Sequence, residues 1–126
     1  MSHLAIHTRS TAAGPVMELT GGLDYDSCTQ LRGLLPDLNL QAGQQLVIDL
    51  TGITFCDSSG ITALIAARNH ADAARAGIAL AAVPHSISRI FSLVGLDQVF
   101  ATHPTAQAAE AAWTPQSGSA PPAGAG

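Results

Sequence analysis

Several residue types are scarce or absent in this chain of 126 residues, and each shortage argues against a class of protein. There is no lysine, and five arginines stand against nine acidic residues, which gives a net charge of −4. Binding of DNA or RNA depends on a basic surface that neutralises phosphates, so this balance argues against a direct nucleic-acid partner. Charged residues are only 11% and hydrophobic residues 47% of the chain, which is too apolar for a protein disordered over its length.

The sequence also lacks the segments that mark membrane and exported proteins. No apolar run approaches the roughly 20 residues that cross a bilayer. The first residues, MSHLAIHTRSTAAG, do not combine a basic start with an apolar stretch of signal-peptide length. Cys28 and Cys56 are far apart and form no CxxC pair. We therefore expect reduced, buried thiols in a cytoplasmic protein that does not contact a membrane.

The hydrophobic pattern predicts an α/β fold, a small mixed sheet of four to five strands with helices packed against it. The runs HLAIHT (3–8) and PVMEL (15–19) are separated by RSTAAG, and the Gly14-Pro15 pair marks a turn, which together indicate a hairpin. The runs LVIDL and IALAAV, residues 46–50 and 78–83, are typical of buried strands. The short run QVFA, residues 98–101, indicates a last strand.

Apolar residues recur at helical spacing in the segments between these strands. In residues 20–38, Asp24 or Asp26 is placed to cap a helix, and Pro36 is expected to end or bend it. Residues 58–77 give the strongest helical pattern, with Gly77 as the expected stop.

Two further helices are predicted near the C-terminus. The first spans residues 84–95 and is expected to turn Ile87, Ile90, Phe91 and Val94 inward. The second, residues 105–113, is closed by Trp113. Residues 114–126 contain no charge and no large apolar side chain, so we expect one domain over 1–113 and a flexible tail over 114–126.

The segment Asp57-Ser58-Ser59-Gly60 stands between the central strand and the longest helix. Open α/β sheets place functional loops beyond the carboxyl ends of their strands, which is where this segment is predicted to lie. One interpretation is structural, because Ser58 or Ser59 can cap the helix by accepting a free N–H group.

Three functional interpretations stand beside the cap. A catalytic serine would need a G-x-S-x-G turn and a base, but Cys56 precedes Ser58 by two residues and no histidine is an obvious partner. A nucleotide-binding site is not indicated, because the chain has neither a Walker A nor a G-x-G-x-x-G sequence. The third is phosphorylation, because a helix N-terminus tolerates a phosphoserine whose added charge repels a docked partner. The residues are compatible with phosphorylation, but by themselves they do not favour it over the other interpretations.

Four segments resemble the STAS domain of bacterial anti-sigma factor antagonists over roughly residues 4 to 113. They are LTGGLD (19–24), VIDLTGITFCDSSGITALIAARNHADAARAG (47–77), VPHSISRIFSLVGLDQVF (83–100) and ATHPTAQAA (101–109). The D-S-S-G turn is the most specific of these agreements. The chain is thus similar to proteins that bind other proteins and are not enzymes.

The resemblance implies a phosphorylation cycle at this turn. The unphosphorylated protein would bind an anti-sigma factor with serine-kinase activity and so free the sigma factor. The kinase, with its own ATP and Mg²⁺, would phosphorylate Ser58 and end the binding, and a phosphatase would restore it. No cofactor or metal would belong to this chain. The implied partner-binding residues are Asp24, Asp57, Ser58, Ser59, Gly60 and Thr62.

Two positions depart from the family pattern, and other interpretations stay open. Gly22 stands where family members often carry an acid, and Thr62 where some carry glycine. Both lie near the implied partner surface, so the partner's identity stays open. One alternative is a STAS subunit of another assembly, such as a lipid-transport complex or a signalling scaffold, without a kinase cycle. A minor enzyme or nucleotide binder is a third interpretation.

Overall fold

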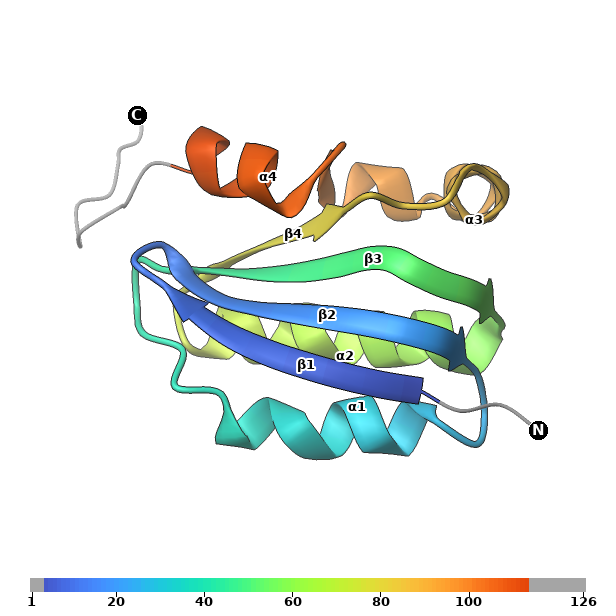
Figure 1. The fold of residues 1–126 in the computed structure, drawn as a ribbon, viewed down its shortest axis with the longest axis horizontal. Coiled ribbons are helices and arrows are strands. Elements are labelled where there is room, and N and C mark those ends of the chain that lie inside the picture. Colours follow the sequence, from blue (N-terminus) through green and yellow to red (C-terminus); the bar gives the residue numbers. More distant parts are fainter. Residues whose placement is uncertain (1–3, 114–126) are drawn as a thin grey trace.

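The computed structural model describes residues 4–113, and the predicted tail, 114–126, lies outside the described residues. Five strands form one sheet in the order β1-β2-β3-β4-β5 (Figure 1). The strands are β1 (Leu4–Thr11), β2 (Gly14–Leu23), β3 (Gln45–Cys56), β4 (Gly77–Ala81) and β5 (Ala101–His103). β1 is antiparallel to β2, and the other neighbours are parallel. The predicted hairpin and mixed sheet are confirmed, but the turn lies at residues 12–13, and Gly14 and Pro15 already belong to β2.

Helices cover both faces of the sheet. They are α1 (Cys28–Leu34), α2 (Ser58–Ala73), α3 (His85–Leu93) and α4 (Ala106–Ala112). α1 and α2 lie along one face, and α4 lies on the other (Figure 1). The larger core includes Leu19, Ile48 and Leu64 together with Phe91 of α3. The smaller core lies under α4 and contains only valine and alanine: Val16, Val47, Ala79, Ala81, Ala106 and Ala109.

Most predicted elements are present, with shifted ends. Pro36 acts as expected, because α1 gives way to a 3-10 turn at Leu35–Asp37. The central strand does not end near residue 50 but continues to Cys56, so the D-S-S-G segment follows it directly. QVFA is not a strand. A 3-10 turn at Leu96–Gln98 occupies its start, and β5 begins only at Ala101.

The prediction that Gly77 ends α2 is wrong. The helix ends at Ala73, and Arg75 adopts the left-handed conformation with φ 59°. Gly77 instead begins β4, where an added Cβ would lie 2.5 Å from the Trp113 ring. The glycine therefore leaves room for the Trp113 ring at the C-terminal end of α4, a contact that no local pattern reveals.

The inward face of α3 was predicted only in part. Ile87 and Phe91 are buried, but Ile90 and Val94 are exposed. A period of 3.6 residues places apolar residues on a helix without saying how much of its circumference the sheet covers. α3 therefore carries apolar side chains on its solvent side as well.

Candidate functional site

The parallel pairing of β2 with β3 brings two loops to the same edge of the sheet. Leu23, the last residue of β2, pairs with Cys56, the last residue of β3. The backbone N–H of Asp57 donates to the carbonyl oxygen of Leu23 at 3.2 Å, which extends the pairing by one step. Asp24 and Asp57 each follow directly after these strand ends. The sheet thus brings together the loop after β2 and the N-terminus of α2.

Asp57, rather than either serine, caps α2. Its Oδ1 accepts a hydrogen bond from the backbone N–H of Gly60 at 3.0 Å. The prediction that Ser58 or Ser59 caps the helix is therefore wrong. The helix begins at Ser58, so the cap position falls on the residue before it, where a carboxylate is also favoured by the helix dipole.

The Ser58 hydroxyl is left free for other chemistry. Ser58 is exposed, and its hydroxyl makes no hydrogen bond to any other residue in the part of the chain that is described. Its backbone carbonyl accepts from the hydroxyl of Thr62 at 3.0 Å. Ser59 is half-buried and Thr62 is exposed. Of the two serines, Ser58 presents the more accessible hydroxyl.

Gly60 is buried and allows α2 to approach the end of β2 closely. A Cβ at this position would lie 2.3 Å from the carbonyl oxygen of Leu23 and 2.8 Å from the Sγ of Cys56. The crowding that requires glycine thus comes from within this chain. Gly60 fixes where the start of α2, and so the Ser58 hydroxyl, sits at the edge of the sheet.

Asp24 and Ser27 hold the loop after β2 in place. The Oδ1 of Asp24 accepts the backbone N–H groups of Asp26 and Ser27, both at 3.1 Å. The buried hydroxyl of Ser27 donates to the carbonyl of Gly22 at 2.7 Å and accepts the N–H of Asp24 at 2.9 Å. Asp24, one of the two residues predicted to cap this region, closes the turn that leads into α1. Sequence reasoning missed Ser27, although the D-x-x-S spacing after a strand was a usable signal.

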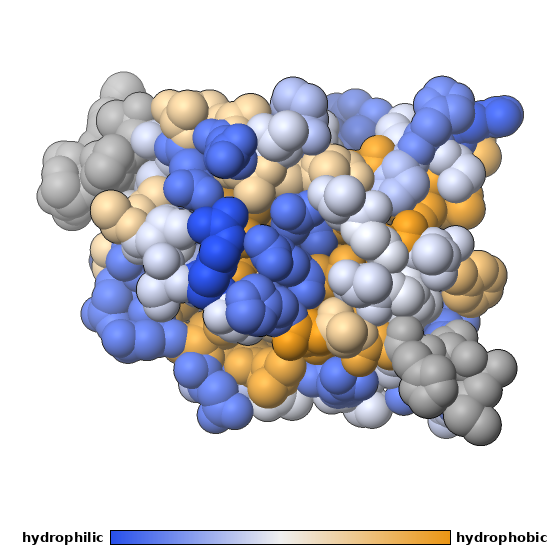
Figure 2. Space-filling view, in the orientation of Figure 1, coloured by the Kyte–Doolittle hydropathy of each residue, from blue (hydrophilic) through white to orange (hydrophobic). Residues whose placement is uncertain are grey.

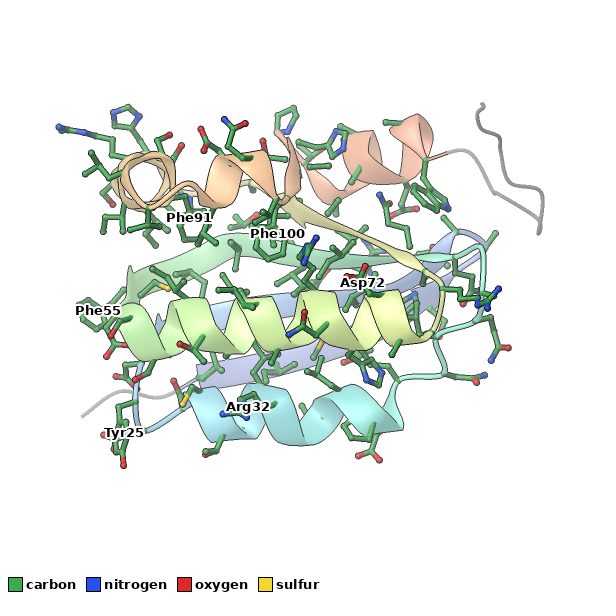
Figure 3. All side chains as sticks on the ribbon, turned by 180° about the vertical axis from the view of Figure 1, so that it is seen from behind. Tyr25, Arg32, Phe55, Asp72, Phe91 and Phe100 are labelled. Carbon is green, nitrogen blue, oxygen red and sulfur yellow. The ribbon has the colours of Figure 1, made fainter. Side chains whose placement is uncertain are left out.

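Large apolar side chains surround this end of the molecule without being buried. Tyr25, in the loop after β2, is 76% exposed, and Phe55, near the end of β3, is 52% exposed. Both lie by the N-terminal ends of α1 and α2 (Figure 3). α3 lies at the same end, with Leu93 83% exposed (Figure 1). Figure 2 shows hydrophobic surface at this end, beside α3. The sequence did not mark any of these three residues as exposed, because exposure depends on the tertiary structure.

Neither cysteine is suited to be a nucleophile. Both are free thiols and both are buried. Burial, together with the neighbouring negative charge of Asp57, raises the pKa of the Cys56 thiol to about 11. The reactive thiolate is therefore a minor species at neutral pH, and Cys56 serves as a small packing residue beneath Gly60.

Within residues 4–113, no group of three or more histidine, cysteine or acidic side chains is arranged to hold a metal ion. Over the same residues, no helix combines the length and the apolar character needed to cross a membrane.

Comparison with known families identifies the fold. The family model described as "Mlab, STAS domain" matches residues 6–102, which is most of the chain. The chain belongs to the STAS domain family. A search of curated proteins finds no match.

Solved structures share this STAS fold at low sequence identity. An anti-sigma factor antagonist from Mycobacterium paratuberculosis is 22% identical, with a TM-score of 0.72 over 88% of this chain and 94% of that one. The antagonist SpoIIAA in its unphosphorylated form is 18% identical, with a TM-score of 0.69 over 83% and 92%. A sulfate transporter family protein from Wolinella succinogenes is 13% identical, with a TM-score of 0.71 over 82% and 86%. STAS domains thus occur in both regulators and transporter-family proteins.

Proposed function

We propose that this STAS protein is an anti-sigma factor antagonist whose binding is switched off by phosphorylation of Ser58. Its unphosphorylated form binds an anti-sigma factor with serine-kinase activity, and the sigma factor is thereby freed. A phosphatase reverses the modification. In this proposal the chain is a substrate and a regulator rather than an enzyme, and it needs no nucleic acid, membrane or cofactor of its own.

The observation that carries the proposal is the free hydroxyl of Ser58 at the first residue of α2. A protein kinase needs a hydroxyl that projects into solvent and is not engaged in the fold. Because Asp57 has the capping role, Ser58 can be modified without removing a hydrogen bond that holds the helix. A phosphate there also faces the positive end of the helix dipole, so the modified protein stays folded.

The surroundings of Ser58 support protein docking. Asp24, Asp57, Ser59 and Thr62 flank it as the polar part of the docking surface, while Gly60 holds α2 in position beneath them. The exposed side chains of Tyr25 and Phe55 supply apolar contact area, as does Leu93 on α3, the helix at the same end. Interfaces of this kind draw most of their binding free energy from a few buried aromatic and aliphatic side chains.

Phosphorylation would break such a complex through electrostatics and desolvation. It adds a charge of roughly −1.5 to −2 at the exposed tip of the turn. Opposing like charges across an interface costs several kcal/mol, and each ~1.4 kcal/mol is a tenfold change in affinity. A single modification therefore suffices to release the partner while the domain keeps its structure.

The first test is phosphorylation by the cognate serine kinase, the anti-sigma factor of this proposal. With ATP and Mg²⁺, peptide mass spectrometry is expected to find the phosphate on Ser58 of the wild-type protein and of the Ser59→Ala variant. The Ser58→Ala variant is expected to stay unmodified. A kinase that is active on another substrate but leaves Ser58 untouched would contradict the proposal.

The second test measures binding to the same kinase by calorimetry. Ser58→Ala is expected to keep the wild-type affinity, whereas Ser58→Glu is expected to weaken it at least about tenfold. Gln41→Glu adds the same charge in an exposed loop before β3, at the opposite edge of the sheet, and serves as the matched control. Equal affinities for the alanine and glutamate variants would contradict the proposal that charge at Ser58 controls binding.

A second candidate function is a STAS subunit of another assembly, such as a transport complex, that docks through this surface without a kinase cycle. It is favoured by the transporter-family structure and by the family model named above. Purification of the Ser58→Ala protein from the source cell distinguishes the two. Recovery of a serine kinase supports the antagonist, and recovery of transporter subunits in its place supports the alternative.

A further inference from the structure

A groove of about 430 Å³ opens between α1 and α2, beside the phosphorylation turn. The loop after β2 contributes Tyr25 and Asp26 to its wall, α1 contributes Arg32, and α2 contributes Ser59 and Thr62. Ser59 follows Ser58 in the chain, and Thr62 donates to the Ser58 carbonyl. The groove is therefore continuous with the turn that carries Ser58.

Arg32 is the single basic residue that lines this groove. It is exposed and forms no ion pair within the described residues, whereas Arg9 and Arg68 each pair with an acid. Figure 3 shows Arg32 on α1 and Tyr25 beyond the N-terminal end of that helix. Asp26 supplies the opposite charge to the same groove, yet it does not pair with Arg32 either. The groove thus presents two unpaired charges of opposite sign.

We propose that this groove receives a segment of the docking partner that presents a carboxylate to Arg32 and a basic side chain to Asp26. The inference rests on the proposed function and names the partner chemistry that this chain selects. A guanidinium binds a carboxylate with two parallel hydrogen bonds, which fixes orientation as well as charge. The hydroxyl of Ser59 makes no other hydrogen bond in the described structure and is available as a further donor. The exposed ring of Tyr25 covers the apolar part of the segment.

The groove also accounts for the direction of the switch. A partner carboxylate held by Arg32 lies close to the start of α2. A phosphate on Ser58 then places a second anion beside it, and the two repel each other. Binding and release are in this way coupled through the same small group of residues.

The test compares three variants for binding to the kinase that modifies Ser58. Arg32→Gln keeps a polar side chain of similar reach and is expected to raise the Kd tenfold or more. Asp26→Asn is expected to raise it several-fold. Arg75→Gln removes the same charge two residues beyond the C-terminal end of α2, whose 16 residues span about 24 Å, and is expected to leave the Kd unchanged. The salt dependence of the Kd is expected to fall for Arg32→Gln, because an ion pair is lost.

The outcomes separate this inference from the proposed function. If Ser58→Glu weakens binding while Arg32→Gln and Asp26→Asn bind as the wild type does, the kinase docks outside the groove and the inference is overturned alone. If Ser58→Glu also binds normally, both fail. Partial recovery of Arg32→Glu by an acid-to-arginine change in the kinase would identify the carboxylate directly. Thermal unfolding of Arg32→Gln is expected to match the wild type, since the side chain is exposed.

Discussion

At the scale of single residues, the acceptor hydroxyl is available because a neighbour has taken its structural role. Asp57 caps α2 through the N–H of Gly60, which leaves the Ser58 hydroxyl in solvent. Asp57 thus caps the helix and Ser58 offers the free hydroxyl, whereas the sequence had suggested both roles for the serines. This division of roles depends on α2 starting at Ser58, a boundary that a local pattern locates only to within a few residues.

Gly60 provides a stability test at this scale. Gly60→Ala is expected to lower the free energy of unfolding by about 1–3 kcal/mol, because the new methyl group would collide with the Leu23 carbonyl and force α2 to shift. Gly33→Ala is the control, since nothing lies within 4 Å of a Cβ on that exposed helical residue. It is expected to gain about 0.5–1 kcal/mol from better helix propensity. Urea unfolding followed by circular dichroism measures both, and equal stability of the two variants would refute the packing account.

At the scale of elements, α3 is apolar on two sides. Ile87 and Phe91 enter the core, while Ile90 and Leu93 face solvent. A helix with this distribution is suited to stand between a core and a second protein. The sequence predicted the helix correctly but assigned Ile90 and Val94 to the core, because periodicity alone does not say where the fold ends.

The solvent side of α3 can be tested separately from its core side. Leu93→Asp is expected to change stability by less than about 0.5 kcal/mol and to weaken binding of the kinase at least about tenfold. Phe91→Ala is expected to cost about 3–5 kcal/mol of stability, since its ring is buried. Calorimetric binding and chemical unfolding give the two quantities. If a folded Leu93→Asp variant binds the kinase as the wild type does, α3 is not part of the docking surface.

At the scale of the whole molecule, the two faces of the sheet differ in how they are held. The larger core contains leucine, isoleucine and phenylalanine, whereas the buried cluster under α4 consists of valine and alanine. The position of α4 depends on contacts at its ends and side. The indole N–H of Trp113 donates to the carbonyl of Gly43 at 3.0 Å, and Arg9 lies 3.5 Å from the carboxylate of Glu110.

Trp113 is therefore expected to contribute more to stability than its place at the end of the described chain suggests. Trp113→Ala removes the ring that packs on Gly77 and the hydrogen bond to Gly43. We expect a loss of about 2–3 kcal/mol, below the ~3–5 kcal/mol of a fully buried ring, because Trp113 is half-buried. Gln107→Ala, on the exposed side of α4, is expected to have almost no effect. Urea unfolding compares the variants, and an unchanged midpoint for Trp113→Ala would contradict this role.

The sequence by itself determined the order of most elements, the hairpin, the bend at Pro36 and the position of the D-S-S-G segment between a strand and a helix. These features follow from local periodicity and from the backbone limits of proline and glycine, which act within a few residues. It also supported the family resemblance, since the motif is contiguous in the chain.

Only the tertiary structure decided which atoms meet. The pairing of Leu23 with Cys56 brings the two loops of the site together, the ring of Trp113 explains Gly77, and the packing of α1 beside α2 opens the groove that contains Arg32. Each of these contacts joins residues far apart in sequence. Their geometry depends on how whole elements pack, and no local pattern encodes that.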